Sequence, residues 1–306
     1  MNTILGAGGA IGNELAKELQ KNNQPIRLVG RHPKPFANAE LKPADLSNYE
    51  QTQNAVKGSS IVYLTAGLAY DIKVWRELWP KIMRHTIDAC KQHNARLIFF
   101  DNVYCLGKVN GAMTEETPFH PTSKKGEVRA QIATLLLNEI KAGNIKAMIT
   151  RSADFYGPDC GTSVFNSLVT DKFAKGKKAQ WLINDKVKHS YTYTRDCGKA
   201  LWLLSQTETA WNQTWHMPSA HPPLTGKEMI EIAAKYFGVK PGYMVISKFF
   251  ARLGGLFNTI IKELNEMIYQ NDSDYIFDSS KIEKAFGIIP TSYEEGIKAT
   301  AESYLK

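Results

Sequence analysis

The sequence has 306 residues, of which 43% are hydrophobic and 22% are charged, so we expect a folded globular chain and exclude a disordered one. No run of about 20 apolar residues occurs, which argues against a membrane span. The formal net charge is +8, but the basic residues are dispersed. This pattern favours attraction of small phosphorylated ligands over nucleic-acid binding.

The four cysteines are scattered along the chain, and neither a C-x-x-C pair nor a histidine cluster with zinc spacing occurs; they are Cys90, Cys105, Cys160 and Cys197. We therefore expect reduced, mostly buried thiols, no metal site and a cytoplasmic location. We expect no signal peptide, because the first predicted strand starts at the first residue.

The chain opens with a buried strand at residues 1–5 and a glycine-rich turn, followed by a helix on which Leu15 and Leu19 recur at helical spacing. Unpaired N–H groups and the helix dipole favour an anion at such a helix start. Glycine lets the backbone approach a pyrophosphate, which a Cβ would hold away. The order of strand, turn and helix predicts a dinucleotide site. Its predicted contacts are Gly6, Gly8, Gly9, Ala10, Ile11 and Gly12.

Apolar strands and helical patterns then alternate along the first half of the chain. The strands are predicted at residues 26–29, 61–65, 97–100 and 146–150, and two of the helices at residues 74–93 and 127–141. Alternation of this kind implies right-handed crossovers and a parallel sheet. We predict an α/β, Rossmann-like doubly wound parallel sheet, which binds ligands at the carboxyl ends of its strands.

The pattern changes after Pro158. Helical stretches at 164–175, 227–237 and 249–269 are mixed with short strands near 180–183 and 189–194. We expect residues 1–158 to form the dinucleotide-binding domain, to which a segment near 189–205 returns. Residues 159–306 are expected to form mostly a smaller, mixed substrate-binding lobe. The apolar stripe from Phe249 to Ile268 predicts core or lid packing, with a partner or membrane-surface helix as the alternative.

Several strings agree with one family. They are G-x-x-G-x-x-G at Gly6, Gly9 and Gly12, V-Y-L-T-A-G-L at 62–68, R-S-A-D-F-Y-G-P at 151–158, the stretch 189–200, and D-x-x-K from Asp278 with Gly287 and Pro290. Together they resemble the extended and atypical branches of the short-chain dehydrogenase/reductase superfamily, often labelled NAD-dependent epimerase/dehydratase. The resemblance covers nearly the whole chain. It implies cofactor contacts from Ala66, Gly67 and Leu68, and from Asn102, Ala153, Asp154 and Phe155 near the nicotinamide.

The end of the second strand bears on the choice of cofactor. NAD-preferring sites place an acid there, whereas this chain has Gly30, Arg31 and His32. A guanidinium pairs with a 2′-phosphate that a carboxylate would repel, so we predict NADP over NAD. The alternative is a surface arginine without a role. Asp45 and Leu46 occupy the family's adenine-edge position, although Asp45 could instead cap a turn.

The resemblance implies catalysis by a Tyr and a Lys one helical turn apart, together with a Ser after the fifth strand. Counted from Pro121, Lys125 stands at the Tyr position and Arg129 at the Lys position, while Asn102 stands at the Ser position. All three identities are therefore replaced. The Y-x-x-x-K strings at Tyr104 and Tyr236 lie off the expected helix, so we interpret them as chance matches.

Three interpretations remain open. In the first, Tyr104 donates a proton and Lys125 or Arg129 stabilises an oxyanion; Lys125 could also serve as a base or bind the cofactor. This interpretation predicts an NADP-dependent oxidoreductase or epimerase-like enzyme for a small carbonyl, hydroxyl or sugar-type substrate. In the second, the chain is a catalytically silent NADP-binding sensor or partner-binding protein. In the third, the alignment is off by a turn and Ser123 or Tyr156 acts. A homodimer is compatible with the resemblance.

Overall fold

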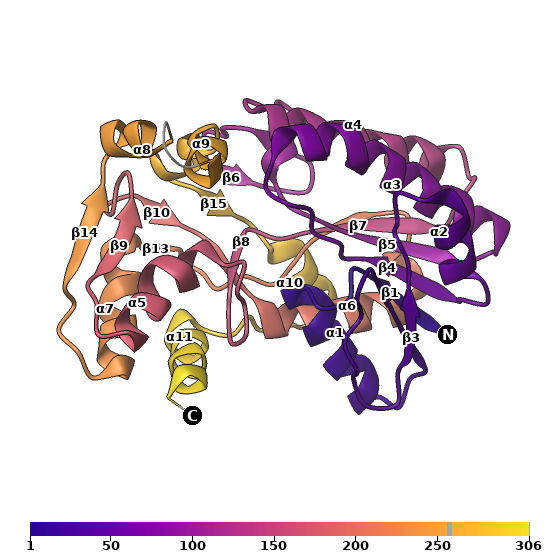
Figure 1. The fold of residues 1–306 in the computed structure, drawn as a ribbon, viewed down its shortest axis with the longest axis horizontal. Coiled ribbons are helices and arrows are strands. Elements are labelled where there is room, and N and C mark those ends of the chain that lie inside the picture. The colour runs from indigo at the N-terminus through magenta and orange to yellow at the C-terminus, as the bar shows by residue number, and fades with distance from the viewer. Residues whose placement is uncertain (256–258, 306) are drawn as a thin grey trace. The chain divides into compact units, whose positions relative to one another are not determined.

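The computed structural model describes residues 1–255 and 259–305 (Figure 1). The chain forms two compact units. The first contains Met1–Cys105, Lys124–Arg151 and Cys197–Trp215. The second contains Leu106–Ser123, Ser152–Asp196 and His216–Lys306. The chain therefore passes between the units several times.

The first unit is built on a seven-stranded sheet of order β12-β7-β5-β4-β1-β2-β3. Its strands are β1 (Asn2–Leu5), β2 (Ile26–Gly30), β3 (Glu40–Pro43), β4 (Ile61–Leu64), β5 (Arg96–Asp101), β7 (Ala147–Arg151) and β12 (Thr214–His216). The pairs that join β3 through to β7 are all parallel. Apolar side chains of the central strands, such as Ile4, Leu64 and Phe99, are fully buried, as a sheet covered on both faces requires.

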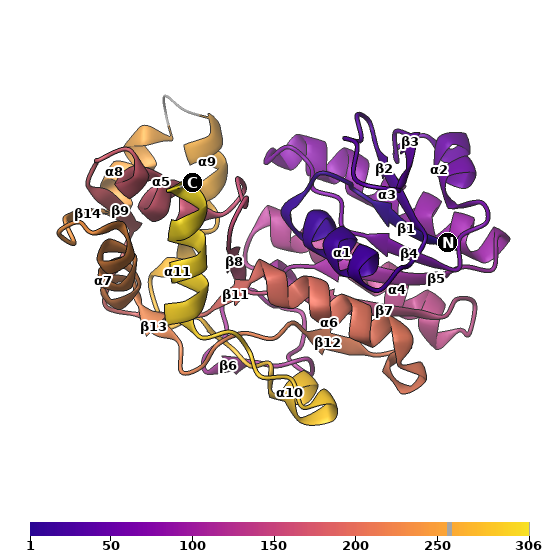
Figure 2. The same cartoon turned by 90° about the horizontal axis from the view of Figure 1, so that it is seen from below.

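Helices cover both faces of this sheet. They are α1 (Ala10–Lys21), α2 (Tyr49–Val56), α3 (Ile72–Gln92), α4 (Lys124–Lys141) and α6 (Thr194–Gln206), with short 3₁₀ turns η1 (Tyr104–Leu106) and η3 (Glu208–Ala210). The helices α2, α3 and α4 lie on one face, and α1 and α6 lie on the other (Figures 1 and 2). A Cβ on Gly198 of α6 would lie 2.7 Å from the Glu14 carbonyl oxygen of α1, so glycine permits this close helix contact. The predicted Rossmann-like doubly wound fold is confirmed.

The second unit combines short sheets with helices. Its strands are β6 (Ala112–Met113), β8 (Asp154–Tyr156), β9 (Ala179–Leu182), β10 (Lys188–His189), β11 (Tyr191–Tyr193), β13 (Leu224–Thr225), β14 (Tyr243–Ile246) and β15 (Ile276–Phe277). Its helical segments are η2 (Asn166–Thr170), α5 (Asp171–Ala174), α7 (Gly226–Phe237), α8 (Lys248–Gly254), α9 (Thr259–Asn265), η4 (Ile268–Asn271), α10 (Ser280–Phe286) and α11 (Tyr293–Tyr304). The helices α7 and α11 lie side by side (Figure 2), and each begins with a capping box.

The boundaries between the units differ from the predicted ones. The predicted first boundary was residue 158, but the first unit ends at Arg151 on that stretch. The reason is that β8 pairs with β11 inside the second unit, with Asp154 opposite Tyr191. The returning segment is Cys197–Trp215, and residues 106–123 belong to the second unit.

The predicted helix at 249–269 is divided into α8, α9 and the 3₁₀ turn η4. The consecutive glycines Gly254 and Gly255 follow Leu253, and glycine disfavours a helix interior. Phe249 and Phe250 are 69% and 64% exposed, whereas Met267 is buried. Core packing therefore holds for Met267 and not for the two phenylalanines. Phe257 of the predicted stripe lies outside the described residues. Within the part of the chain that the structure describes, no helix is long and apolar enough to cross a bilayer.

Candidate functional site

The glycine turn after β1 packs tightly against the end of β4. Gly6 has a φ of +106°, and a Cβ there would lie 2.4 Å from the backbone of Ala66. A Cβ on Gly12 would lie 3.1 Å from Thr65 Oγ1, so the start of α1 also approaches this strand closely. Gly6 therefore requires glycine for steric reasons, whereas a Cβ at Gly12 would fit only if its neighbours shifted by a few tenths of an ångström. The fold thus brings the predicted residues Gly6, Gly12 and Ala66 together.

The start of α1 has the features of an anion site. Its N-cap residue is Gly9, no side chain caps the helix and its first turn carries no acidic residue. Gly8 has a φ of +94°, and the space on its Cβ side is open. The first amides of α1, near Ala10 and Ile11, are therefore not capped by a side chain. The donor set of backbone N–H groups fits a diphosphate.

Two charged residues lie at the far end of the predicted cofactor site. Arg31 follows β2 and is exposed. Asp45 follows β3, and its Oδ1 accepts hydrogen bonds from the Ser47 hydroxyl at 2.7 Å and the Ser47 N–H at 2.9 Å. These bonds, and the attraction of Arg31, lower the pKa of the Asp45 carboxyl group. Asp45 therefore caps a turn, as the alternative interpretation expected, and it also attracts Arg31. The neighbouring Leu46 is buried.

Tyr104 lies in the 3₁₀ turn after β5. Its backbone N–H donates to Asn102 Oδ1 at 3.0 Å, so Asn102 shapes the turn that presents the phenol. The ring of Tyr104 stacks on Trp75 of α3, with ring centroids 6.3 Å apart and an interplanar angle of 14°. The Tyr104 hydroxyl oxygen lies 3.5 Å from that of Tyr70.

Tyr70 also contacts Lys125, and it was missed by sequence reasoning. Lys125, near the start of α4, is fully buried, and its Nζ lies 4.5 Å from the centroid of the Tyr70 ring. Tyr70 therefore lies between the two predicted catalytic residues Tyr104 and Lys125. Tyr70 follows the A-G-L corner at the carboxyl end of β4, and this position could have identified it as a candidate site residue. We call Tyr70, Tyr104 and Lys125 the tyrosine–lysine cluster.

Arg129 lies one turn further along α4 and is only 4% exposed. Its Nε donates to Oδ1 of Asp101 at 2.7 Å, and its Nη2 forms an ion pair with the same oxygen. The guanidinium lies 4.4 Å from the Trp79 ring centroid and 5.0 Å from that of Phe99. The buried pair of Arg129 and Asp101 thus anchors α4 to the end of β5. A contact of Arg129 with substrate stays a prediction.

The remaining predicted residues, Ala153, Asp154 and Phe155, belong to the second unit. The Ala153 N–H donates to Thr192 Oγ1 at 3.1 Å, and the Asp154 carboxylate lies 3.0 Å from Nε2 of His189. The nearby Tyr156 is only 1% exposed, and burial raises the pKa of its phenol well above the usual value. An acid–base role for Tyr156 is therefore disfavoured.

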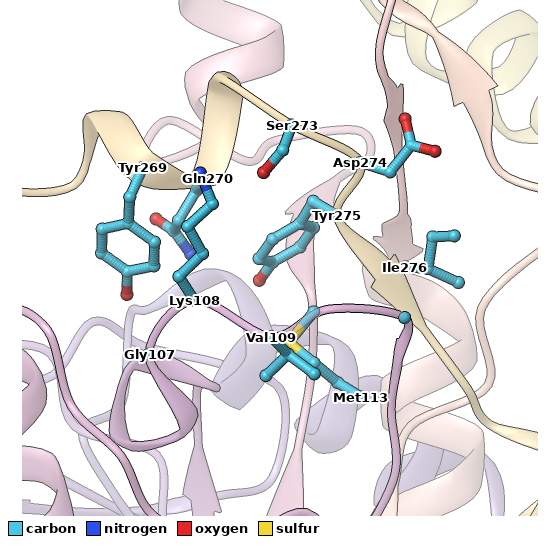
Figure 3. A pocket seen from close by; sticks show the side chains of 11 residues that line it. Gly107, Lys108, Val109, Met113, Tyr269, Gln270, Ser273, Asp274, Tyr275 and Ile276 are labelled. Atoms are coloured by element: carbon cyan, nitrogen blue, oxygen red, sulfur yellow. The ribbon is translucent and has the colours of Figure 1, made fainter.

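Figure 3 shows a pocket within the second unit, lined by the loop 107–113 and by residues 269–276. Lys108 of this loop forms an ion pair with Asp272 at 2.8 Å. The open centre of about 10 Å³ is close to what one water molecule needs. The pocket contains none of the predicted site residues.

All four cysteines are buried, and none forms a disulfide bond within the part of the chain that the structure describes. Within residues 1–255 and 259–305, no three His, Cys, Asp or Glu side chains gather as a metal ion would require.

Comparison with solved structures finds similar folds over essentially the whole chain. One is UDP-glucose 4-epimerase of Thermus thermophilus in complex with NAD, at 16% identity and a TM-score of 0.81, covering 100% of this chain and 99% of that one. Another is a double mutant of the dTDP-glucose 4,6-dehydratase DesIV from Streptomyces venezuelae with NAD bound, at 15% identity and a TM-score of 0.83, covering 100% and 97%. A third is UDP-N-acetylglucosamine 4-epimerase from Bacillus cereus, at 15% identity and a TM-score of 0.77, covering 99% and 95%. At these identities the likeness shows the fold alone.

Comparison with curated proteins finds no match. A family match spans residues 3–215, which include the glycine turn, the end of β4 and the tyrosine–lysine cluster. The chain belongs to the NAD dependent epimerase/dehydratase family.

Proposed function

We propose that this chain is an oxidoreductase of the epimerase/dehydratase type that binds a nicotinamide dinucleotide and acts on a sugar-type substrate. The tyrosine–lysine cluster is the observation that carries the proposal. In this cluster the partly exposed Tyr104 hydroxyl lies 3.5 Å from the Tyr70 hydroxyl, and the Lys125 cation lies over the Tyr70 ring. All three side chains lie beyond the carboxyl ends of parallel strands. Ligands of doubly wound sheets bind at this edge.

Residues of the first unit would hold the cofactor. The amides of the glycine turn, from Gly6 to Gly12, would bind the diphosphate, and Ala66 to Leu68 would line its path. The nicotinamide supplies a hydride acceptor or donor when it is bound. We assign the choice between NADP and NAD to Arg31, which is exposed at the end of β2 and attracted by Asp45. Several of the structural neighbours were solved with NAD. The proposed preference for NADP rests on Arg31 and on the lack of an acidic residue at Gly30, Arg31 and His32.

Tyr104 would exchange the proton of a substrate hydroxyl or carbonyl. The adjacent hydroxyl of Tyr70 can donate to a Tyr104 phenolate, and the Lys125 cation over the Tyr70 ring favours negative charge nearby. Asn102 fixes the turn and Arg129 fixes the helix, so both hold the cluster in place. The sugar-type substrate is supported by the neighbours, which are described as enzymes of UDP- and dTDP-sugars.

The test uses the purified chain with NAD or NADP and a panel of UDP- and dTDP-hexoses. We expect Tyr104→Phe and Lys125→Met to lower kcat by about 100-fold or more, with cofactor affinity kept. Lys124→Met is the matched control, because Lys124 is the exposed neighbour of Lys125 on the same helix. An equal loss of kcat in the Lys124 and Lys125 variants would show that Lys125 has no specific role in the reaction.

A second candidate function is a cofactor-binding sensor without turnover. One observation favours it: Lys125 and Arg129, which we align with the family's Tyr and Lys, are both buried. The two functions separate in the same assay. Tight binding of the dinucleotide with no turnover on the panel, unchanged in Lys125→Met, would support the sensor.

A further inference from the structure

The helix α8 of the second unit presents an aromatic pair to solvent. Phe249 and Phe250 are 69% and 64% exposed, and their rings meet edge to face with centroids 5.6 Å apart. Leu253 is 42% exposed and lies four and three positions further along the helix, so the three side chains share one face. We call Phe249, Phe250 and Leu253 the aromatic face. A cluster of exposed apolar side chains, unlike a single one, indicates an interaction surface.

The other side of α8 is packed without the help of the aromatic face. Ala251 and Gly255 are buried one helical turn apart. Asn265 of α9 donates from Nδ2 to the Ala251 carbonyl oxygen at 3.2 Å, and the Ser247 hydroxyl caps the helix by accepting from the Phe250 N–H. The helix is thus held by its small residues and its backbone. The aromatic face is free to contact a partner without disturbing these contacts.

The strand before α8 adds further exposed apolar side chains. β14 leads directly into α8 (Figure 1), and its residues Met244 and Val245 are 54% and 38% exposed. In the part of the chain that the structure describes, β14 pairs with β9 alone, in a two-stranded sheet. Exposed apolar surface therefore extends from the strand to the helix.

The pairing of β14 with β9 gathers basic residues that are far apart in the sequence. Residues 172–184 and 238–262 each contain four lysine or arginine residues and no aspartate or glutamate. β9 belongs to the first segment and β14 to the second, and Ala179 lies opposite Tyr243 in their parallel pairing. A Cβ on Gly242 would lie 3.5 Å from Cγ of Lys178, so the two segments also touch beside the strands. The fold thus concentrates positive charge around β14 and α8.

The acidic residues near these segments do not cancel this charge. The Asp272 carboxylate is shared by Lys248 at 2.9 Å and Lys108 at 2.8 Å, so these three groups together keep one positive charge. The acids that flank the segments in sequence are Asp171, Asp185, Glu263 and Glu266. Lys177, Lys178 and Arg252 are all exposed. The basic residues outnumber the acids, and the surface around the aromatic face is positive.

We propose that the aromatic face of α8, with the basic segments 172–184 and 238–262, binds the surface of an anionic lipid bilayer. The apolar side chains enter the boundary between head groups and acyl chains, and the lysines attract the lipid phosphates. A second copy of this face would bring like charges together, which is unfavourable. Nucleic acid is also anionic, but Leu253 and Met244 have no ring to stack on a base. This inference does not rest on the proposed function.

The test is co-sedimentation of the purified full chain with large unilamellar vesicles at about 0.1 M salt. Vesicles of phosphatidylcholine with phosphatidylglycerol are compared with vesicles of phosphatidylcholine alone. We expect a partition coefficient at least about tenfold larger for the anionic vesicles, and a clear fall at high salt, because salt screens the attraction. Absence of binding to the anionic vesicles, or equal binding to both kinds, overturns the proposal.

The aromatic face is tested with the double variant Phe249→Ser/Phe250→Ser. We expect its partition coefficient to fall by at least about tenfold, while thermal unfolding stays nearly unchanged because both rings are exposed. Ile289→Ser is the matched control: Ile289 is 90% exposed, and residues 287–295 contain no lysine or arginine. Binding that survives in the double variant, or that falls equally in Ile289→Ser, overturns the role of this face.

The basic segments are tested with Lys177→Glu/Lys178→Glu. We expect binding to the anionic vesicles to weaken by at least about tenfold, because each lysine near such a surface contributes to the attraction. Lys57→Glu/Lys141→Glu changes the net charge equally at exposed positions of the first unit and should have little effect. Equal losses in the two double variants would show that net charge alone attracts the chain, which overturns the proposed surface.

The same variants identify other occupants of the aromatic face. A concentration-dependent dimer in analytical ultracentrifugation that is lost in Phe249→Ser/Phe250→Ser, without vesicle binding, would assign the face to a second copy and overturn the proposal. Binding of a labelled single-stranded oligonucleotide that is lost in the same variant, again without vesicle binding, would also overturn it. None of these measurements uses turnover, so their failure is distinct from a failure of the proposed function.

Discussion

The carboxyl edge of the first unit's sheet, where we propose that ligands bind, uses different chemical groups at its two ends. At the end proposed to bind the diphosphate the groups are backbone amides, and Gly6 leaves no room there for a Cβ. At the end proposed for catalysis the groups are the side chains of Tyr70, Tyr104 and Lys125, which meet from three separate segments. A backbone site tolerates little change because it depends on the fold itself. A side-chain site can be rebuilt with other residues, as we propose for this chain.

The sharpest way to break this comparison is at Gly6. A Cβ at Gly6 would lie 2.4 Å from the Ala66 backbone, whereas one at Gly8 would meet open space, although both residues have positive φ. We expect Gly6→Ala to reduce dinucleotide affinity by at least about 100-fold or to prevent folding. Gly8→Ala carries the strain of a positive φ but no clash, so it should lose less stability than Gly6→Ala. Calorimetric titration measures the dinucleotide affinity of each variant, and thermal unfolding measures its stability. Equal effects of the two variants would contradict a steric role for Gly6.

The next largest effect is expected at the buried pair of Arg129 and Asp101. Arg129→Met leaves the Asp101 carboxylate buried without this cation, so we expect a loss of about 3–5 kcal/mol in the free energy of unfolding. Arg84→Met removes the exposed pair of Arg84 with Glu139 and should cost about 1 kcal/mol or less. Urea unfolding measures both. A loss for Arg129→Met no larger than the control would show that the pair does not anchor α4.

A smaller and more specific effect is expected at Arg31. Arg31→Ala should weaken NADP binding by about tenfold, the equivalent of about 1.4 kcal/mol, and leave NAD binding nearly unchanged. The measurement is fluorescence titration with each reduced cofactor. An unchanged ratio of the two affinities would identify Arg31 as a surface residue without a role in selection.

The smallest effect is expected at Cys105, which follows Tyr104 in the chain. Burial raises the pKa of its thiol to about 12, so the thiolate is populated only above about that pH while the chain is folded. Iodoacetamide at pH 8 should therefore leave Cys105 unlabelled in the native protein and label it after denaturation. Rapid native labelling, read by mass spectrometry, would show that this region opens to solvent.

The fold and the close packing of the glycine turn could be predicted from the sequence because local patterns determine them. Alternating buried strands and helices specify the parallel sheet, and the close approaches at Gly6 and Gly12 leave a visible glycine spacing. The two-unit boundary could not be located, since it depends on which strand pairs with β8. Tyr70 lies 34 residues from Tyr104, and Asp154 lies 35 residues from His189, so neither contact leaves a local pattern. The division of the predicted helix at 249–269 could have been predicted from Gly254 and Gly255, because glycine disfavours a helix interior.

The stacking of Trp75 on Tyr104 gives this molecule a built-in optical reporter. The indole also meets the Tyr70 ring edge-on, at a centroid distance of 5.7 Å, so its surroundings are those of the phenols themselves. A molecule that reorients either phenol changes the polarity and quenching around that indole. Emission from Trp75, isolated by difference against Trp75→Phe, therefore reads out events at the phenols in real time, without any label and before any product forms.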